Sequence, residues 1–275
     1  MTFTGDKLIE IRDLHFAYGA RPVLAGLDLD IPRGKVVAIL GTSGCGKSTL
    51  LQLIGGALRP SRGTVKVCDR DVHALDREGL YALRRQVGMM FQKGGLFSDL
   101  TVFENVAFPL REHTDLPEDV IADLVKMKLH AVGLRGAHRL YPTELSGGMA
   151  RRVALALAIA LDPDLVIYDE PFAGLDPITL NVICNLIRTL NDALGSTSVV
   201  VTYDVTEAVK LADELYVMGG GRIVGHGPTR EMLESTDPFV RQFLHAQPDG
   251  PVPFHFPAKS IREELDLACP APAAR

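Results

Sequence analysis

Residues 41–49, Gly-Thr-Ser-Gly-Cys-Gly-Lys-Ser-Thr, have the types and spacing of a phosphate-binding loop. The three glycines let backbone N–H groups converge on phosphate oxygens. The ammonium of Lys47 suits the terminal phosphates of a nucleotide, and the hydroxyl of Ser48 suits Mg²⁺. We therefore predict that nine residues bind a nucleoside triphosphate: Gly41, Thr42, Ser43, Gly44, Cys45, Gly46, Lys47, Ser48 and Thr49.

The elements beside this loop must hold it in place. Val36 to Leu40 is an apolar run that predicts a buried strand, and Leu50 to Ile54 predicts the start of a helix. A strand, a glycine-rich loop and a helix in this order aim the loop amides at an anion on the positive helix terminus.

Polar side chains follow two further predicted strands. Leu165 to Glu170 is an apolar strand that ends in two carboxylates, where Asp169 suits Mg²⁺ and Glu170 suits polarising an attacking water. Paired acids at a strand end can also be only a solvated terminus. Gln92 ends the strand Val87 to Phe91, and open α/β sheets place ligand-binding groups at carboxyl ends of strands.

A second anion site is predicted at Leu145 to Met149, where a long helix through Leu161 begins. Ser146 suits the N-cap, while Gly147 and Gly148 leave backbone N–H groups open at the positive end of the helix. This site lies more than one hundred residues from the first along the chain. We predict that it serves a phosphate held by a second copy of the chain.

Other segments carry weaker signals. Residues 7–18 alternate as an edge strand does, and Tyr18 could stack on an adenine ring or pack at the strand end. Residues 93–110 are rich in apolar side chains, which suits either the core of a helical subdomain or a docking surface. The spacing predicts a helix over residues 117–132 with one apolar face, formed by Val120, Leu124, Met127 and Ala131.

Composition restricts the function classes. The 275 residues suffice for one large α/β domain or two small ones, and the net charge of −5 argues against a nucleic-acid partner. The four cysteines and eight histidines show no metal-ligand spacing, and the scattered cysteines predict a reducing cytoplasm. We expect neither a signal peptide nor a membrane span.

The ordered set of motifs closely resembles the ATP-binding subunits of ABC transporters over residues 7–235. The resemblance implies a P-loop NTPase, an α/β fold with a RecA-like core, an antiparallel β subdomain and an α-helical subdomain near residues 93–160. It implies ATP and Mg²⁺ as ligands, and a head-to-tail dimer in which each signature motif closes over the ATP of the opposite subunit. It also implies roles for particular residues: adenine stacking for Tyr18, the Walker A loop for 41–49, Q-loop metal contact and permease sensing for Gln92, the signature for Ser146, Gly147 and Gly148, Walker B for Asp169, catalysis for Glu170, and the D-loop for Asp176.

A narrower resemblance is to the ATPases of bacterial phospholipid transporters that maintain outer-membrane lipid asymmetry. It is carried by residues 91–102, 170–178, 241–244 and 249–254. It implies a membrane permease, a small STAS-domain subunit and a periplasmic MCE lipid-binding protein as partners. It also implies a peripheral position on the cytoplasmic face of the inner membrane.

Two positions depart from the family pattern. Tyr203 replaces a histidine that contacts the γ-phosphate, and Leu157 replaces an arginine on the signature helix. A phenol presents a different geometry from imidazole, so we predict that ATP still binds but that hydrolysis is slowed. Two alternatives remain: an importer ATPase for a small polar solute, which would share the core motifs but differ in the tail, and a weakly catalytic, nucleotide-dependent regulatory subunit, which Tyr203 suggests.

We predict two domains, an ABC ATPase domain over residues 1–247 and a proline-rich extension over residues 248–275. Six of the 17 prolines lie in the extension, with Phe254 and Phe256 among them. Such a segment has no core of its own. We expect an arm anchored on the partner subunit up to about Ala258.

Overall fold

The computed structural model describes residues 6–92, 94–252 and 264. The chain divides into two compact units, and the boundary between them along the sequence lies between Glu234 and Ser235. Within the described residues, no helix combines the length and the apolarity needed to cross a bilayer.

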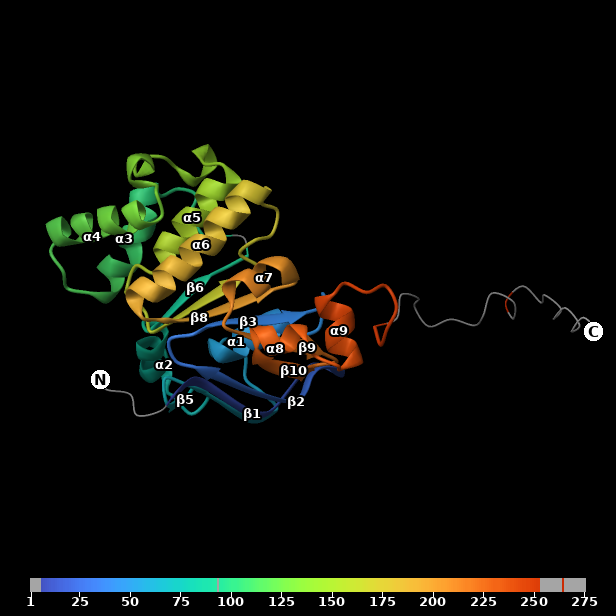
Figure 1. Ribbon diagram of the computed structural model, residues 1–275. Helices are drawn as coiled ribbons and strands as arrows, with labels where there is room; N and C mark the ends of the chain where they lie inside the picture. The colour runs from blue at the N-terminus through green and yellow to red at the C-terminus, as the bar shows by residue number, and fades with distance from the viewer. Residues whose placement is uncertain (1–5, 93, 253–263, 265–275) are drawn as a thin grey trace, which may run out of the picture. The chain divides into compact units, whose positions relative to one another are not determined.

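A six-stranded sheet forms the centre of the first unit, in the order β10-β9-β3-β8-β7-β6 (Figure 1). Neighbouring strands from β9 to β6 are parallel, and β10 runs antiparallel to β9. Their bounds are β3 Val36–Gly41, β6 Val87–Met90, β7 Leu165–Asp169, β8 Thr197–Thr202, β9 Glu214–Gly219 and β10 Arg222–Pro228. Because β3, β6, β7 and β8 are parallel, the residues that follow them gather at one edge of the sheet.

A second sheet is antiparallel, in the order β2-β1-β4-β5. It comprises β1 Lys7–Tyr18, β2 Arg21–Pro32, β4 Arg62–Val67 and β5 Arg70–Asp71. The prediction that residues 7–18 form an edge strand was wrong, because β1 pairs with β2 on one side and with β4 on the other. Alternation of apolar residues identifies the buried face of a strand, and it does not distinguish an edge from the interior.

Helices α1 to α8 of the first unit are distributed around these sheets (Figure 1), and α9 belongs to the second unit. Their bounds are α1 Lys47–Ile54, α2 Arg77–Arg84, α3 Val102–His113, α4 Glu118–Ala131, α5 Gly147–Ala158, α6 Pro177–Leu194, α7 Val205–Leu211, α8 Thr229–Leu233 and α9 Pro238–Leu244, with two 3-10 turns, η1 Arg135–Ala137 and η2 Pro142–Glu144. Helices α3, α4 and α5 pack against one another in a common apolar cluster. The capping box of Thr101 and Glu104 begins α3, which explains where that helix starts.

The face predicted for α4 was wrong. Its buried apolar side chains are Ile121, Val125 and Leu129, whereas Val120 is 40% exposed and Met127 is 65% exposed. The sequence contains two apolar stripes displaced by one position along the helix. The stripe that meets the cluster of α3 and α5 is buried, a choice that only tertiary packing makes.

The central sheet is buried on both faces. Alternate residues of β7 enter different clusters: Leu165 and Ile167 pack toward α1 and the antiparallel sheet, whereas Val166 and Tyr168 pack toward the helices. On β6 the packing is closest at Gly88, where a Cβ atom would lie 2.0 Å from the carbonyl oxygen of Ala158 on α5. The backbones of β6 and α5 are thus in direct contact.

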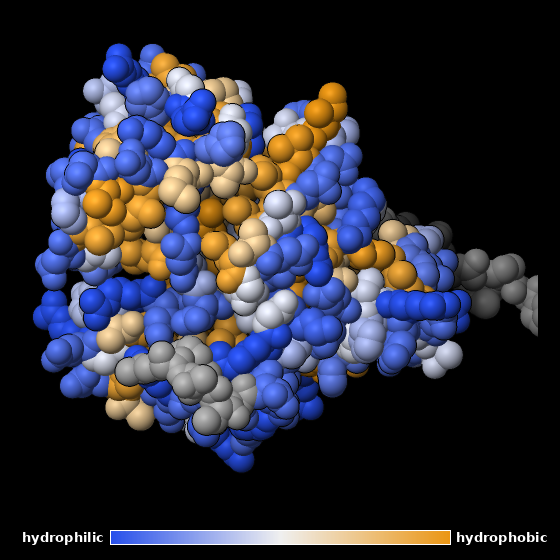
Figure 2. All heavy atoms as spheres, turned by 60° about the vertical axis from the view of Figure 1, so that its left-hand side comes forward, coloured by the Kyte–Doolittle hydropathy of each residue, from blue (hydrophilic) through white to orange (hydrophobic). Residues whose placement is uncertain are grey.

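The segment from 94 to 110 contains both core and surface. Val102 and Val106 are buried in the helical cluster, while Phe97 and Phe108 are exposed and their rings lie 5.0 Å apart. Figure 2 shows that apolar side chains gather on this side of the molecule. The core interpretation is therefore confirmed for part of the segment, and docking stays a prediction.

The second unit begins with α9. Asp237 caps this helix by accepting hydrogen bonds from the backbone N–H groups of Phe239 and Val240. The side-chain amide of Gln242 then makes two hydrogen bonds with the backbone of Val252, at 2.7 and 3.0 Å. Of the predicted extension, the structure describes residues 248–252 and 264, so Phe254 and Phe256 lie outside the described residues. The boundary predicted at residue 247 stays a prediction.

Candidate nucleotide-binding and hydrolysis site

The loop after β3 has the backbone that the glycines were predicted to supply. Gly44 and Gly46 have φ values of 77° and 110°, in the left-handed region that favours glycine. Gly41 is needed for a different reason, because a Cβ atom there would lie 2.7 Å from the carbonyl oxygen of Met218. Gly46 is also the N-cap of α1, so the loop amides surround the positive end of that helix.

Lys47 is the first residue of α1, and its side chain is buried. Its ammonium donates hydrogen bonds to the carbonyl oxygens of Gly41 at 2.7 Å and Thr42 at 3.2 Å. These contacts keep a buried cation solvated by backbone dipoles. They also hold the ammonium over the loop, where charged phosphate oxygens would accept stronger hydrogen bonds from it than the neutral carbonyl oxygens do.

A pocket of about 560 Å³ lies beside this loop. It is lined by Tyr18, Arg21, Val23, Ser43, Gly44, Gly46, Lys47, Ser48, Thr49, Gln92, Glu170 and Tyr203. Ten of these residues were predicted from the sequence, and they come from five separate stretches of the chain. Thr42 and Cys45 line an adjoining recess that shares Ser43 and Gly44 with the pocket.

Sequence reasoning missed Arg21 and Val23, which line the pocket at the start of β2. The turn between β1 and β2 brings them beside Tyr18, with which Arg21 pairs. The ring of Tyr18 meets the ring of Phe16 edge to face at 4.9 Å and is half exposed. The ring of Tyr18 therefore both packs against Phe16 at the strand end and lines the pocket.

Asp169 ends β7 in a recess that also contains Ser48. Its Oδ1 atom is buried and has no hydrogen-bond partner in the described part of the chain. Burial raises the pKa of this carboxyl. A carboxylate oxygen without a hydrogen-bond partner, in the same recess as a serine hydroxyl, is a suitable ligand for a hard cation. Mg²⁺ in nucleotide sites is usually held by one or two such protein oxygens together with phosphate oxygens of the substrate.

No group of three or more His, Cys, Asp or Glu within the described ranges is placed to hold a metal ion. Mg²⁺ in nucleotide sites does not need such a group, because it keeps waters and phosphate oxygens as ligands. Ser48, Gln92 and Asp169, predicted as metal contacts, all line the pocket or the recess beside it.

Glu170 follows Asp169 with a φ of 47°, which is strained for a residue with a side chain. Its backbone N–H donates to the carbonyl oxygen of Val201 on the next strand at 2.8 Å. The carboxylate enters the pocket, and its Oε2 atom accepts hydrogen bonds from the Thr202 hydroxyl and the Tyr203 amide. Burial raises the pKa of the Glu170 carboxyl, and these donors together with Lys47 oppose that shift.

Thr202 is another residue that sequence reasoning missed. It ends β8, whose residue Val201 lies opposite Asp169 in the sheet. Pairing the ends of the two predicted strands would have brought it beside Glu170. Tyr203 comes next, and its side chain is 55% exposed where it lines the pocket.

The predicted signature residues lie at the start of α5 and do not line this pocket. Ser146 caps α5 by accepting a hydrogen bond from the amide of Met149 at 3.3 Å, as predicted from the sequence. Asp176 caps α6 by accepting hydrogen bonds from Ile178 and Thr179. Gly148 and Thr179 are close, since a Cβ atom at 148 would lie 2.5 Å from Thr179 Cγ2.

Arg151 connects three of these elements and was also missed. Its guanidinium donates from α5 to the carbonyl oxygen of Phe91 at 3.3 Å and to that of Ala173 at 3.5 Å. Phe91 precedes Gln92, and Ala173 lies between Glu170 and Asp176. Its position three residues after Gly148, the second signature glycine, was the available signal.

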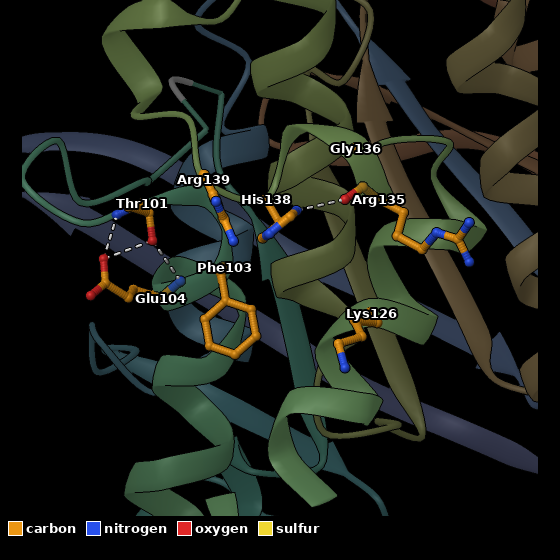
Figure 3. Close-up of a pocket in the computed structure, with 8 residues that line it drawn as sticks. All are labelled: Thr101, Phe103, Glu104, Lys126, Arg135, Gly136, His138 and Arg139. Carbon is orange, nitrogen blue, oxygen red and sulfur yellow. Dashed lines mark hydrogen bonds between the residues drawn. The ribbon is translucent and has the colours of Figure 1, made fainter. Parts of the chain in front are cut away.

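A larger hollow, of about 720 Å³, lies away from these residues beside α3 and η1 (Figure 3). Its lining includes Phe103, Lys126 and Arg139, with His138 bonded to the carbonyl oxygen of Arg135 at 3.0 Å. No residue predicted to bind nucleotide lines it. Size therefore does not identify the candidate site, whereas the converging polar groups beside the loop do.

Comparison with known proteins identifies the family. The family model described as ABC transporter matches residues 24–173, which include the loop, Gln92, the signature and both acids. The chain belongs to the ABC transporter family. Its membership confirms the ABC resemblance, the α/β nucleotide-binding fold and the ATPase activity predicted from the motifs.

Two relatives of this ABC ATPase are similar over almost their whole length. The intermembrane phospholipid transport system ATP-binding protein MlaF of Escherichia coli strain K12 is 50% identical over 259 residues, which are 94% of this chain and 96% of that protein. MlaF of Haemophilus influenzae is 51% identical over 259 residues, or 94% and 98% of the two chains.

A solved structure shares the fold of this ABC ATPase. The ATP-binding cassette MJ0796, described as a dimeric post-hydrolysis state bound to ADP and Pi, aligns with a TM-score of 0.74. The identity is 30%, over 81% of this chain and 99% of that chain.

The two departures from the ABC pattern occupy different surroundings. Tyr203 faces the nucleotide pocket of the ABC ATPase beside Glu170. Leu157 is half-buried near the end of α5, away from the pocket. The structure thus retains α5 and its packing with a leucine at this position.

Proposed function

We propose that this chain is the ATP-hydrolysing subunit of an inner-membrane ABC transporter that moves phospholipids between membranes and maintains outer-membrane lipid asymmetry. The observation that carries the proposal is the 50% identity to MlaF across 94% of this chain and 96% of the relative. Identity at this level extends well beyond the nucleotide motifs, which any ABC ATPase would share.

In this proposal the working unit is a head-to-tail dimer. Ser146, Gly147 and Gly148 lie on α5 apart from the pocket that contains Lys47 and Glu170. A phosphate bound by the loop would meet those glycine amides on a second subunit, with Asp176 at the same interface. The dimeric form of the similar cassette MJ0796 supports this arrangement.

The proposed chemistry is positional and electrostatic. Residues 41–49 and Lys47 hold the phosphates of ATP, and the ring of Tyr18 covers the adenine. Ser48, Asp169 and Gln92 would hold Mg²⁺, which supplies positive charge to the phosphate oxygens when bound. Glu170 accepts a proton from the attacking water, since its carboxylate enters the same pocket.

Dimer closure would complete each site and transmit hydrolysis to a permease through Gln92. The further partners we propose are a small STAS-domain subunit and a periplasmic MCE lipid-binding protein. The chain would lie on the cytoplasmic face of the inner membrane, attached through the permease. Residues 1–247 would form the ATPase domain, and residues 248–275 an extension that reaches the partner subunit.

A slower, switch-like variant of this function is favoured by one observation. Tyr203 stands beside Glu170 in the pocket, where a phenol hydroxyl presents a different hydrogen-bonding geometry from the imidazole of the family pattern. We propose that ATP binds and closes the dimer while turnover is slow.

The test is reconstitution. The chain would be purified with the membrane subunits encoded beside it and incorporated into vesicles that contain labelled phospholipid. We expect ATP-dependent transfer of phospholipid to acceptor vesicles, lost with Glu170→Gln. A complex that moves no phospholipid, but whose ATPase is stimulated by a polar solute, would contradict the proposal and favour an importer.

A further inference from the structure

The Glu170 carboxylate is held at one oxygen and left open at the other. Oε2 accepts from the Thr202 hydroxyl at 3.0 Å and from the Tyr203 amide at 3.3 Å. Within the described ranges, no hydrogen bond involves Oε1. The side chain lines the nucleotide pocket, so the open oxygen is the one that can meet a water there.

The direction of the Thr202 hydrogen bond follows from its neighbour. The backbone N–H of Asp204 donates to Thr202 Oγ1 at 3.0 Å. Because an N–H group can only donate, Oγ1 is its acceptor, and the hydroxyl proton remains for Glu170. The backbone amide of Asp204 thus orients the Thr202 hydroxyl, and the hydroxyl in turn orients the Glu170 carboxylate.

The hydrogen bond between Thr202 and Glu170 is buried. Thr202 is 1% exposed and Glu170 is 7% exposed, so water does not compete for the contact. The β-branched side chain of threonine is restricted at χ1, and it lies at the end of a buried strand. The hydroxyl is therefore held in place before nucleotide enters.

The strained backbone of Glu170 points to the same conclusion. Its φ of 47° turns the residue out of β7, and its amide bonds to Val201 on β8. The side chain then reaches the next residue of β8, Thr202. Both main chain and side chain of Glu170 are therefore fastened to one neighbouring strand.

We infer that Thr202 is a positioning residue for hydrolysis: its hydroxyl fixes Glu170 Oε2, so that Oε1 faces the attacking water. This inference rests on the proposed catalytic role of Glu170. Thr202 itself touches neither ATP nor water in this scheme. Its loss would therefore lower kcat and leave ATP binding unchanged.

The experiment compares variants that differ in the hydroxyl alone. Thr202→Val keeps the shape and removes the hydroxyl, whereas Thr202→Ser keeps the hydroxyl. Steady-state ATPase and equilibrium ATP binding would be measured on the purified complex. We expect kcat to fall about tenfold with valine and to stay within about twofold with serine, with ATP affinity unchanged in both.

A second pair guards against loss of folding. Thr202→Ala and Thr202→Ser both lack the methyl group, and they differ in the hydroxyl, so their ratio of kcat values tests the inference even if the valine variant unfolds. Equal kcat values for alanine and serine would overturn it, as would a valine variant with wild-type turnover or reduced ATP affinity alone.

The Glu170→Gln variant distinguishes failure of the positioning role of Thr202 from failure of the proposed catalytic role of Glu170. If Glu170→Gln retains wild-type turnover, the catalytic role of Glu170 fails and the inference fails with it. If Glu170→Gln abolishes turnover while the hydroxyl variants behave alike, only the role of Thr202 fails.

Discussion

The ammonium of Lys47 donates a 2.7 Å hydrogen bond to the carbonyl oxygen of Gly41, across the loop that these two residues bracket. ATP would offer this ammonium charged phosphate oxygens in place of a neutral carbonyl. Charge-assisted hydrogen bonds of this kind contribute about 1.5–3 kcal/mol, or roughly ten- to a hundredfold in affinity.

Lys47→Ala should therefore weaken ATP binding by about tenfold or more, measured by titration calorimetry. The matched control is Lys66→Ala, because Lys66 is exposed on β4 and lines neither the pocket nor its recesses. Equal ATP affinities for the two variants would contradict a phosphate-binding role for Lys47.

Tyr203→His should raise the steady-state ATPase rate. A neutral imidazole both donates and accepts hydrogen bonds at short range, so we expect a gain of roughly tenfold. Tyr203→Phe is the control, and it should leave the rate close to wild type because the phenol is not expected to act in the reaction. The hypothesis of slowed hydrolysis fails if the histidine variant turns over no faster.

Gly148→Ala should destabilise the fold. Its new Cβ would lie 2.5 Å from Thr179 Cγ2, and Thr179 is held in place by its hydrogen bonds to Asp176. Overpacking of this kind costs about 1–3 kcal/mol in the free energy of unfolding, measurable by urea denaturation.

The adjacent glycine provides the control for that prediction. A Cβ atom at Gly147 would meet nothing within 4 Å, so Gly147→Ala should change the free energy of unfolding by less than about 0.5 kcal/mol. Equal losses of stability for both variants would refute the steric explanation.

Gln242→Leu should release the backbone at Val252. The Gln242 amide both donates to and accepts from Val252, and a leucine can do neither. We expect faster hydrogen exchange of the Val252 amide, by about tenfold for a lost hydrogen bond. Gln247→Leu, at an exposed position, should leave that exchange rate unchanged. Protection that persists in the Gln242 variant would show that other contacts hold this segment.

Deleting residues 248–275 should weaken assembly of the ATPase with its partners, because the extension is proposed to reach the second subunit. Size-exclusion chromatography of the truncated and full-length chains, each expressed with the same membrane subunits, measures this. An unchanged elution profile for the truncated complex would reject the proposed arm.

Much of the candidate site could be predicted because its signals are local. The loop around Lys47 needs glycines at fixed positions, and Asp169 is the last residue of a buried apolar strand. Parallel pairing of β3, β7 and β8 then brings these loop ends together, as the strand pattern indicated.

The residues that were missed depend on pairing between distant segments. Thr202 reaches Glu170 because β8 lies beside β7, and Arg151 reaches Phe91 across 60 residues. The local pattern draws attention to the strand end at Thr202 and to the helix start near Arg151, but it does not show which distant residue each one contacts. The same limit explains the two corrections, since neither the second partner of β1 nor the packed stripe of α4 is encoded by periodicity alone.

The contact between Gly88 and Ala158 connects β6, which leads to Gln92, with α5, which begins at the signature glycines. Backbone meets backbone there, and no side chain stands between them that could change rotamer and absorb a shift. Helix α5 begins at the signature glycines, and β6 is followed by Phe91 and Gln92. If dimer closure displaces the signature end of α5, we expect β6 and the Gln92 segment that follows it to move with the helix.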